Sequence, residues 1–157
     1  MRNVDKKSIV IWNLETITSI SFKLIIASVV FYFFIEYEFI KKAYYLIVAG
    51  GILYLFWDLL LNPFDYKNHK YNLDLDENIL HLRKGSLFLK ESTVPLKRIQ
   101  HVDVSQSFFS RFFNLYEINI YTAGDTHTIG YVNKNISYQL KDNITNYLMS
   151  AGAEIDD

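Results

Sequence analysis

The chain has 157 residues, enough for one ordinary domain, and carries 16 Lys and Arg against 17 Asp and Glu. This near-neutral balance gives no electrostatic case for a nucleic-acid partner, and none is predicted. The chain contains no cysteine, which excludes disulfides, zinc ribbons and thiolate catalysis. Half of the residues are apolar, and their uneven distribution divides the chain into two parts.

Two long apolar stretches occupy the first part. From Ile17 to Ile35, 14 of 19 residues are aliphatic or aromatic, with Lys23 as the one charge. From Ala43 to Leu61, 16 of 19 are apolar, with Asp58 as the one charge. Each stretch is long enough to cross a bilayer as a helix. We therefore predict a membrane-spanning pair of helices in contact with lipid.

The short connection between the stretches sets their orientation. Only Glu36 to Lys42 separates them, so the helices must be antiparallel and both chain ends must share one side. Five Lys and Arg residues flank the hairpin on that side and two lie in the turn. The positive-inside bias therefore predicts cytoplasmic termini. The predicted organisation is a cytoplasmic segment over 1–16, a transmembrane hairpin over 17–61 and a cytoplasmic domain over 62–157.

Short alternating segments fill the second part and are typical of strands with one buried and one wet face. A change to helical spacing follows from Ile136 to Leu148, with Asn135 as its N-cap and Gly152 at its end. The pattern predicts an antiparallel sheet, partly closed on itself and covered by one amphipathic helix. The predicted strands are 66–75, 79–84, 87–94, 99–106, 116–122 and 126–132.

One stretch carries a resemblance to a known family. The run from Val94 to Ser107, with the downstream motif residues, resembles the bacterial pleckstrin-homology-like (bPH2) family, in particular its short, YdbS-like membrane members with two transmembrane helices. Asn114 stands where the family usually has Gly, and Asn tolerates a positive φ. The motif residues are Pro95, Arg98, Ile99, Gln100, Val102, Val104, Gln106, Arg111, Thr122 and Gly124.

The resemblance implies a fold class: a membrane α-helical hairpin followed by a mainly-β, seven-stranded PH-like barrel with a C-terminal α-helix. It also implies residence in the bacterial cell (inner) membrane and a role in binding or assembly. The implied partners are a second copy of the chain or a larger, related membrane protein with several PH-like domains.

No catalytic or metal site is predicted, and no cofactor. His101, Asp103 and Ser105 lie in a row on one strand face, whereas a triad requires the His between its two partners. The four His residues fall on different predicted strands without a metal-binding spacing. We therefore expect a protein that is not an enzyme.

Two sets of residues are candidates for an interaction surface. Arg98 and Arg111 either form an anion site or fix turns by binding carbonyls and carboxylates. The acidic turn at 74–78 disfavours the phosphoinositide-binding mode of eukaryotic PH domains. The most apolar stretch outside the spans must be partly core, and its remaining rings would contact a partner or the bilayer; it contains Phe108, Phe109, Arg111, Phe112 and Phe113.

Protein-protein interaction within a cell-envelope membrane complex is the leading functional hypothesis. The alternatives are a lipid-binding module and a small transport or channel subunit that uses intramembrane polar residues. Lys23 and Asp58 are the candidate polar pair, because their midpoint falls between Ile40 and Lys41 and equal depth would let them meet. The competing interpretation is that each side chain snorkels separately to the headgroups.

Overall fold

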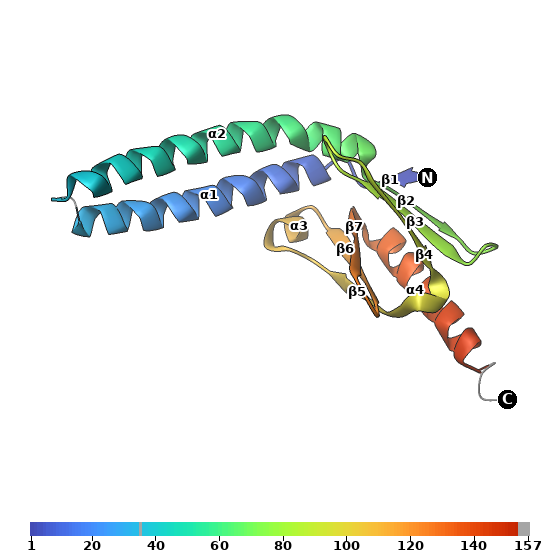
Figure 1. The fold of residues 1–157 in the computed structure, drawn as a ribbon. Coiled ribbons are helices and arrows are strands. Elements are labelled where there is room, and N and C mark those ends of the chain that lie inside the picture. The colour runs from blue at the N-terminus through green and yellow to red at the C-terminus, as the bar shows by residue number, and fades with distance from the viewer. Residues whose placement is uncertain (35, 154–157) are drawn as a thin grey trace.

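The structure is a computed structural model that describes residues 1–34 and 36–153. Ile35, the predicted end of the first span, and the last four residues of the predicted domain lie outside the described residues. A long helical hairpin projects from a small β domain, whose C-terminal helix lies on the side away from the hairpin tip (Figure 1).

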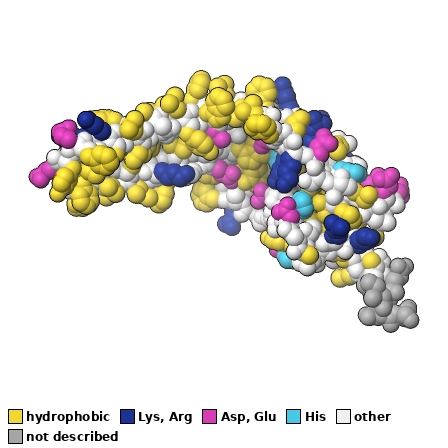
Figure 2. Space-filling view, viewed as in Figure 1, with side chains coloured by type: hydrophobic (Ala, Val, Ile, Leu, Met, Phe, Trp, Pro, Cys, Tyr) yellow, Lys and Arg dark blue, Asp and Glu magenta, His cyan; other side chains and the backbone are white. Residues whose placement is uncertain are grey.

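The hairpin consists of α1 (Ser8–Phe33) and α2 (Glu38–Asn68), which run antiparallel and side by side (Figure 1). Both helices are long and apolar enough to cross a membrane, and hydrophobic side chains cover most of the visible hairpin surface (Figure 2). Both extend beyond the predicted spans. Ser8 and Ile11 in α1 are fully buried against the domain, and α2 continues past Pro63. These helix ends belong to the domain and not to the lipid-facing span.

Two antiparallel sheets form the domain, and a 3-10 turn connects them. The helix α4 (Lys134–Ala153) follows the last strand, and α3 (Phe108–Phe112) connects two strands of the second sheet. The first sheet contains β1 (Arg2–Asn3), β2 (Lys70–Asp74), β3 (Ile79–Lys84) and β4 (Lys90–Pro95), in that order. The turn η1 (Leu96–Arg98) leads to β5 (Ile99–Ser105), β6 (Leu115–Thr122) and β7 (Thr126–Asn133).

The core lies between the two sheets and α4. Alternation along the strands places one apolar face of each sheet inward, so that Leu80 of β3 and Ile118 and Ile129 of the second sheet are almost completely buried. On α4, Leu140 and Ile144 recur at helical spacing and complete this core. The predicted fold class, a helical hairpin followed by a PH-like β domain with a C-terminal helix, is confirmed.

The sequence prediction missed the first strand. Arg2 and Asn3 pair with Tyr71 and Lys70, and the next residue, Val4, is buried in the core. The Asp5 amide then donates to the Tyr131 carbonyl at 2.8 Å. In this structure residues 1–16 are therefore not a separate segment, because the strand formed by Arg2 and Asn3 belongs to the domain. The hairpin is an insertion between the first two strands of the sheet.

Several predicted boundaries differ from the structure. The strand predicted from Tyr66 begins at Lys70, because α2 continues to Asn68. The strand predicted from Leu87 begins at Lys90. The α4 cap is Asn133, whose side chain accepts from the Ile136 amide at 3.0 Å; Asn135 lies inside the helix. Asn114 has a φ of 52°, which agrees with its predicted place at a glycine-favouring turn.

Candidate functional site

Six of the ten motif residues line one surface depression. It lies where β4, η1 and β5 approach the β6–β7 turn, at the end of the domain away from α3, and has a volume of about 560 Å³. Lys97, Asp125 and His127 also line it, and sequence reasoning did not select them because they are single polar residues, two in turns and one in β7, without a motif. The six motif residues are Pro95, Arg98, Ile99, Gln100, Thr122 and Gly124.

Ile99 and three motif residues outside the depression build its frame. Ile99 and Val102 are buried in the core and hold β5 against β6. Val104 packs partly buried against the same core. The Gln106 side-chain amide donates to the Leu115 carbonyl at 3.1 Å and fixes the chain at the other end of β5. These residues determine the geometry of the sheet, and Ile99 also forms part of the floor that the depression shares with the core.

The β6–β7 turn forms one wall of the depression. The Thr122 hydroxyl donates to the Asp125 carbonyl at 2.8 Å and accepts from the Asp125 amide at 3.1 Å. Gly124 lies between them, and a Cβ at this position would meet open space at an ordinary φ. The turn is therefore held by Thr122 and Asp125, and Gly124 can accept a side chain that projects from it.

Neither motif arginine fixes a turn. Arg98, in η1, and Arg111, in α3, are both exposed. Among residues 1–34 and 36–153, no hydrogen bond or ion pair to either guanidinium is formed. The two arginines also lie at opposite ends of β5, so they do not form one anion site together. Arg98, beside Lys97, is the arginine that lines the depression.

The Phe-rich stretch is divided into two faces by α3. Phe109 and Phe113 pack against the buried cluster around Ile11 of α1. Phe108 and Phe112, one helical turn apart, face outward with 68% and 73% of their surface exposed. Their rings contact each other edge to face at 5.3 Å. The structure therefore leaves two of the four rings available for an interaction.

The structure does not bring Lys23 and Asp58 together. The Asp58 carboxylate accepts from the Thr16 hydroxyl at 2.5 Å, while Gly51 lies against Leu24 and its neighbours, at the level of Lys23. The predicted pairing assumed a turn centred between Ile40 and Lys41. The turn lies earlier, because α1 ends at Phe33 and α2 already begins at Glu38. Lys23 is exposed on the hairpin surface.

Acidic groups meet where the hairpin enters the domain. The Tyr131 hydroxyl donates to Glu15 of α1 at 2.7 Å and lies 3.1 Å from the Ser107 hydroxyl. Burial raises the pKa of the nearby Glu117 carboxyl above its ordinary value, and the Glu15 carboxylate raises it further. Burial also raises the pKa of Tyr131. This cluster joins α1 to β6 and β7 and is remote from the depression.

His101, Asp103 and Ser105 do not form a catalytic triad in the part of the chain that the structure describes. His101 and Asp103 lie 3.7 Å apart, both largely exposed, and the His101 ring stacks on Tyr121 at 4.2 Å. The Ser105 hydroxyl instead accepts from Asn119 at 3.2 Å. No group of three or more metal-binding side chains occurs among the described residues.

A membrane hairpin inserted into a PH-like β domain defines a class of membrane protein, and the sequence comparisons agree with it. The chain matches the family described as Bacterial PH domain over residues 9–148 and belongs to that family. It is 30% identical over 78 residues to the UPF0699 transmembrane protein YdbS of Bacillus subtilis (strain 168), and the match covers 49% of each chain. The chain is therefore a YdbS-like member of the family. No solved structure matches it.

Proposed function

We propose that this chain is a membrane-anchored PH-like binding module that assembles with another protein of a cell-envelope membrane complex. The observation that supports the proposal is that six of the ten motif residues, among them the exposed Arg98 and Gln100, line one depression at the membrane-distal end of the domain. Its volume and its mixture of polar and apolar walls suit a protruding side chain or loop of a partner.

The residues around the depression favour a partner with acidic groups. Lys97 and Arg98 are exposed next to each other on η1, and the one acidic residue that lines the depression is Asp125. Arginine without an internal partner is free to form a two-pronged pair with a carboxylate. A second, smaller cavity of about 160 Å³ shares Asp125 and His127 and continues along β7.

The proposed partner is a second copy of the chain or a related membrane protein that carries several PH-like domains. Tethering by the hairpin confines both partners to one membrane surface, which raises their effective concentration and makes a small interface sufficient. A binding role also agrees with the dispersed placement of the His, Asp and Ser side chains described above. We propose this role in place of a catalytic one.

Filling the depression tests the proposal. Gly124→Trp adds a large ring at a residue that lines the depression, at an ordinary φ, and Gly124→Ala is the matched control because its Cβ meets open space. Wild-type protein, co-expressed with a differently tagged copy or with the related multi-domain protein, is expected to co-purify with one of them. Gly124→Trp and Arg98→Gln should reduce this capture about tenfold or more, while Gly124→Ala should not. Equal capture by Gly124→Trp and Gly124→Ala would contradict this site.

We also propose that the chain resides in the bacterial cell membrane with both termini in the cytoplasm. The support is the excess of Lys and Arg on the side of the termini. A reporter that is active only outside the cytoplasm, fused after Asp157, should stay silent. The same reporter inserted in the hairpin turn, after Tyr37, should be active, and the opposite result at both positions would reverse the orientation.

A further inference from the structure

The β3–β4 loop exposes an apolar segment that sequence reasoning read as a strand. Leu87 is more than half exposed and Leu89 is half exposed. Phe88 has 89% of its surface exposed, the largest fraction among the exposed large hydrophobic residues. Three consecutive apolar side chains in a loop are costly in water and mark a contact surface. The loop is called the Phe88 loop below and comprises Gly85–Leu89.

The Phe88 loop is fastened to the end of α2. The Gly85 amide donates to the Asp65 carboxylate at 3.0 Å, and the Gly85 carbonyl accepts from the Asn68 side chain at 2.9 Å. Gly85 has a φ of +120°, and a Cβ there would lie 1.9 Å from the Phe88 carbonyl oxygen. A turn that requires glycine and two hydrogen bonds therefore hold the exposed side chains of the Phe88 loop in a defined position.

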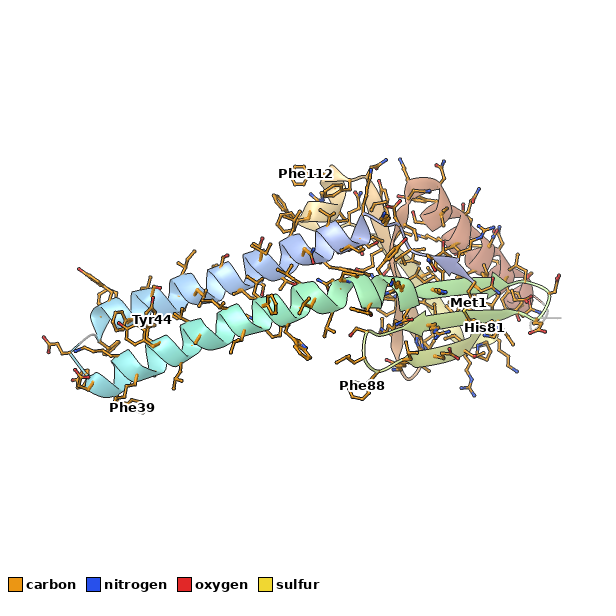
Figure 3. The ribbon with its side chains drawn as sticks, turned by 90° about the horizontal axis from the view of Figure 1, so that it is seen from above. Met1, Phe39, Tyr44, His81, Phe88 and Phe112 are labelled. Atoms are coloured by element: carbon orange, nitrogen blue, oxygen red, sulfur yellow. The ribbon has the colours of Figure 1, made fainter. Side chains whose placement is uncertain are left out.

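A second exposed apolar group, Phe108 and Phe112 of α3, lies on the other side of the hairpin, at a similar position along its length. Figure 3 shows Phe88 and Phe112 on opposite sides of the two helices, at similar positions along their length. The contacts agree. The Phe88 loop lines a cavity with residues 58–65 of α2, while α3 packs on Ile11 of α1. A hydrogen bond of 2.7 Å from Asn62 to Asn13 ties those two levels together.

The Phe88 loop and α3 both lie at the end of the hairpin where the membrane span meets the domain. At the other end, the hairpin tip carries the Glu38–Lys41 ion pair of 2.7 Å and the following Lys42. At 1.5 Å per residue the helix rises about 30 Å from Lys42 to Asn62, which is the thickness of a bilayer hydrocarbon core. When the polar tip lies at one interface, both apolar protrusions reach the opposite interface.

Cations border both protrusions. Lys84 and Lys90 flank the Phe88 loop, and both are exposed. They are direct cross-strand partners in β3 and β4, and two adjacent cations favour a nearby anion. Asp65 of α2 supplies one such charge to Lys84, and Lys90 has none among the ion pairs of the described residues. Arg111 is exposed on α3 between Phe108 and Phe112. Apolar rings surrounded by Lys and Arg suit the headgroup region of a bilayer that contains anionic lipid.

We propose that the Phe88 loop and the Phe108/Phe112 face of α3 insert into the interface of the same bilayer that the hairpin spans. The domain then rests on the membrane at three places, namely the hairpin and one protrusion on each side of it. Both protrusions lie beside the end of the membrane span, the Phe88 loop against α2 and α3 against α1, so the bilayer is the partner that they reach. This contact is separate from the membrane-distal depression.

Site-directed nitroxide labelling tests the contact, and the cysteine-free chain provides a silent background. Single Phe88→Cys and Phe112→Cys labels are reconstituted at one protein per nanodisc of phosphatidylcholine and phosphatidylglycerol. Phe56→Cys on the exposed face of α2 is the lipid reference, and Ala123→Cys at the distal turn is the water reference. Collision rates are measured with oxygen, which partitions into lipid, and with a water-soluble nickel chelate.

Labels 88 and 112 are expected to resemble label 56, with a severalfold higher ratio of oxygen to nickel collisions than label 123. Nickel-accessible labels at both positions would overturn the proposal. Labels shielded from both reagents would also overturn it, because such shielding indicates contact with protein. Since labelling replaces the ring under test, Leu89→Cys and Phe108→Cys retain Phe88 and Phe112 and should give the same result.

A paired substitution separates the role of the Phe88 ring from a general loop effect. In the Leu89→Cys background, Phe88→Asp should shift label 89 severalfold toward nickel accessibility, while Phe88→Leu should leave it lipid-accessible. Because Phe88 is almost fully exposed, neither change removes a core contact. An unchanged label 89 in Phe88→Asp would show that the ring does not hold the loop in the interface.

Discussion

The two ends of the PH-like domain differ in what they present. The end beside the hairpin exposes Phe88, Phe108 and Phe112 on rigid supports. The distal end exposes Lys97 and Arg98 around the motif-lined depression, and none of the described residues that line this depression is an aromatic residue other than His127. Apolar protrusions suit a contact that is permanent and unspecific, whereas charged turns suit recognition. Under the two proposals made above, attachment and recognition use separate surfaces of one small domain.

The largest expected loss of stability comes from a substitution in the core, which supports both ends of the domain. Ile118→Ala removes a fully buried side chain between the sheets and should destabilise the domain by about 2–5 kcal/mol. Phe112→Ala removes an exposed ring and should change stability in detergent by less than about 0.5 kcal/mol. Denaturant unfolding in detergent measures both. Equal losses would mean that Phe112 is packed in the domain and is not a membrane-facing ring.

Two glycine substitutions distinguish the two ends of the domain by their effect on its stability. Gly85→Ala forces a Cβ against the Phe88 carbonyl at a positive φ and should cost about 1–3 kcal/mol. Gly124→Ala should be close to neutral because its Cβ meets open space. Thermal unfolding in detergent compares them. If the two variants have the same midpoint, the Phe88 loop is not held by the turn described here.

A smaller effect is expected within the hairpin that joins both ends to the membrane. Thr16→Val and Asp58→Leu should be coupled by about 0.5–1.5 kcal/mol, because their side chains share a hydrogen bond. Lys23→Met and Asp58→Leu should be additive, since Lys23 lies at the level of Gly51. Double-mutant cycles of unfolding in detergent separate the two cases. Coupling of Lys23 to Asp58 would instead support the helix alignment predicted from the sequence, in which these two side chains meet.

The smallest effect concerns pH at the hairpin end of the domain. The pKa of Glu117 is raised in the folded state, so the folded protein holds its proton at pH values where the unfolded chain has lost it. Stability is therefore lost as the pH rises from the ordinary glutamate range through the raised pKa. Glu117→Gln should be more stable than wild type at neutral pH and should converge with it in acid. A constant difference in melting temperature across pH would contradict this assignment.

The sequence was sufficient where a physical pattern repeats over many residues. The two spans follow from runs with one charge each, and four strands were placed to within one residue by alternation. The strands predicted from Tyr66 and Leu87 started too early for a common reason. Tyr66 packs against the domain core from the end of α2, and Leu87 to Leu89 form an exposed apolar loop. Composition alone does not distinguish such residues from a strand.

Other features depend on contacts between distant residues and had no local signal. The first strand is two residues long and carries no alternation, and its partner Tyr71 lies beyond the whole hairpin. The motif residues could be selected from the resemblance, but their division into frame and depression required the fold. Arg98 lines the depression while Ile99, the next residue, is buried in the core.

The insertion of the hairpin between β1 and β2 has a consequence for biosynthesis. The ribosome makes β1 first, but the strand gains its partner only after both helices and β2 have followed. A chain whose second helix failed to insert would leave β1 and β2 on opposite sides of the membrane. The edge of β2 and the core site of Val4 would then stay open, a state that proteases recognise. The pairing of β1 with β2 therefore requires that the hairpin has inserted with both of its ends on the same side of the membrane.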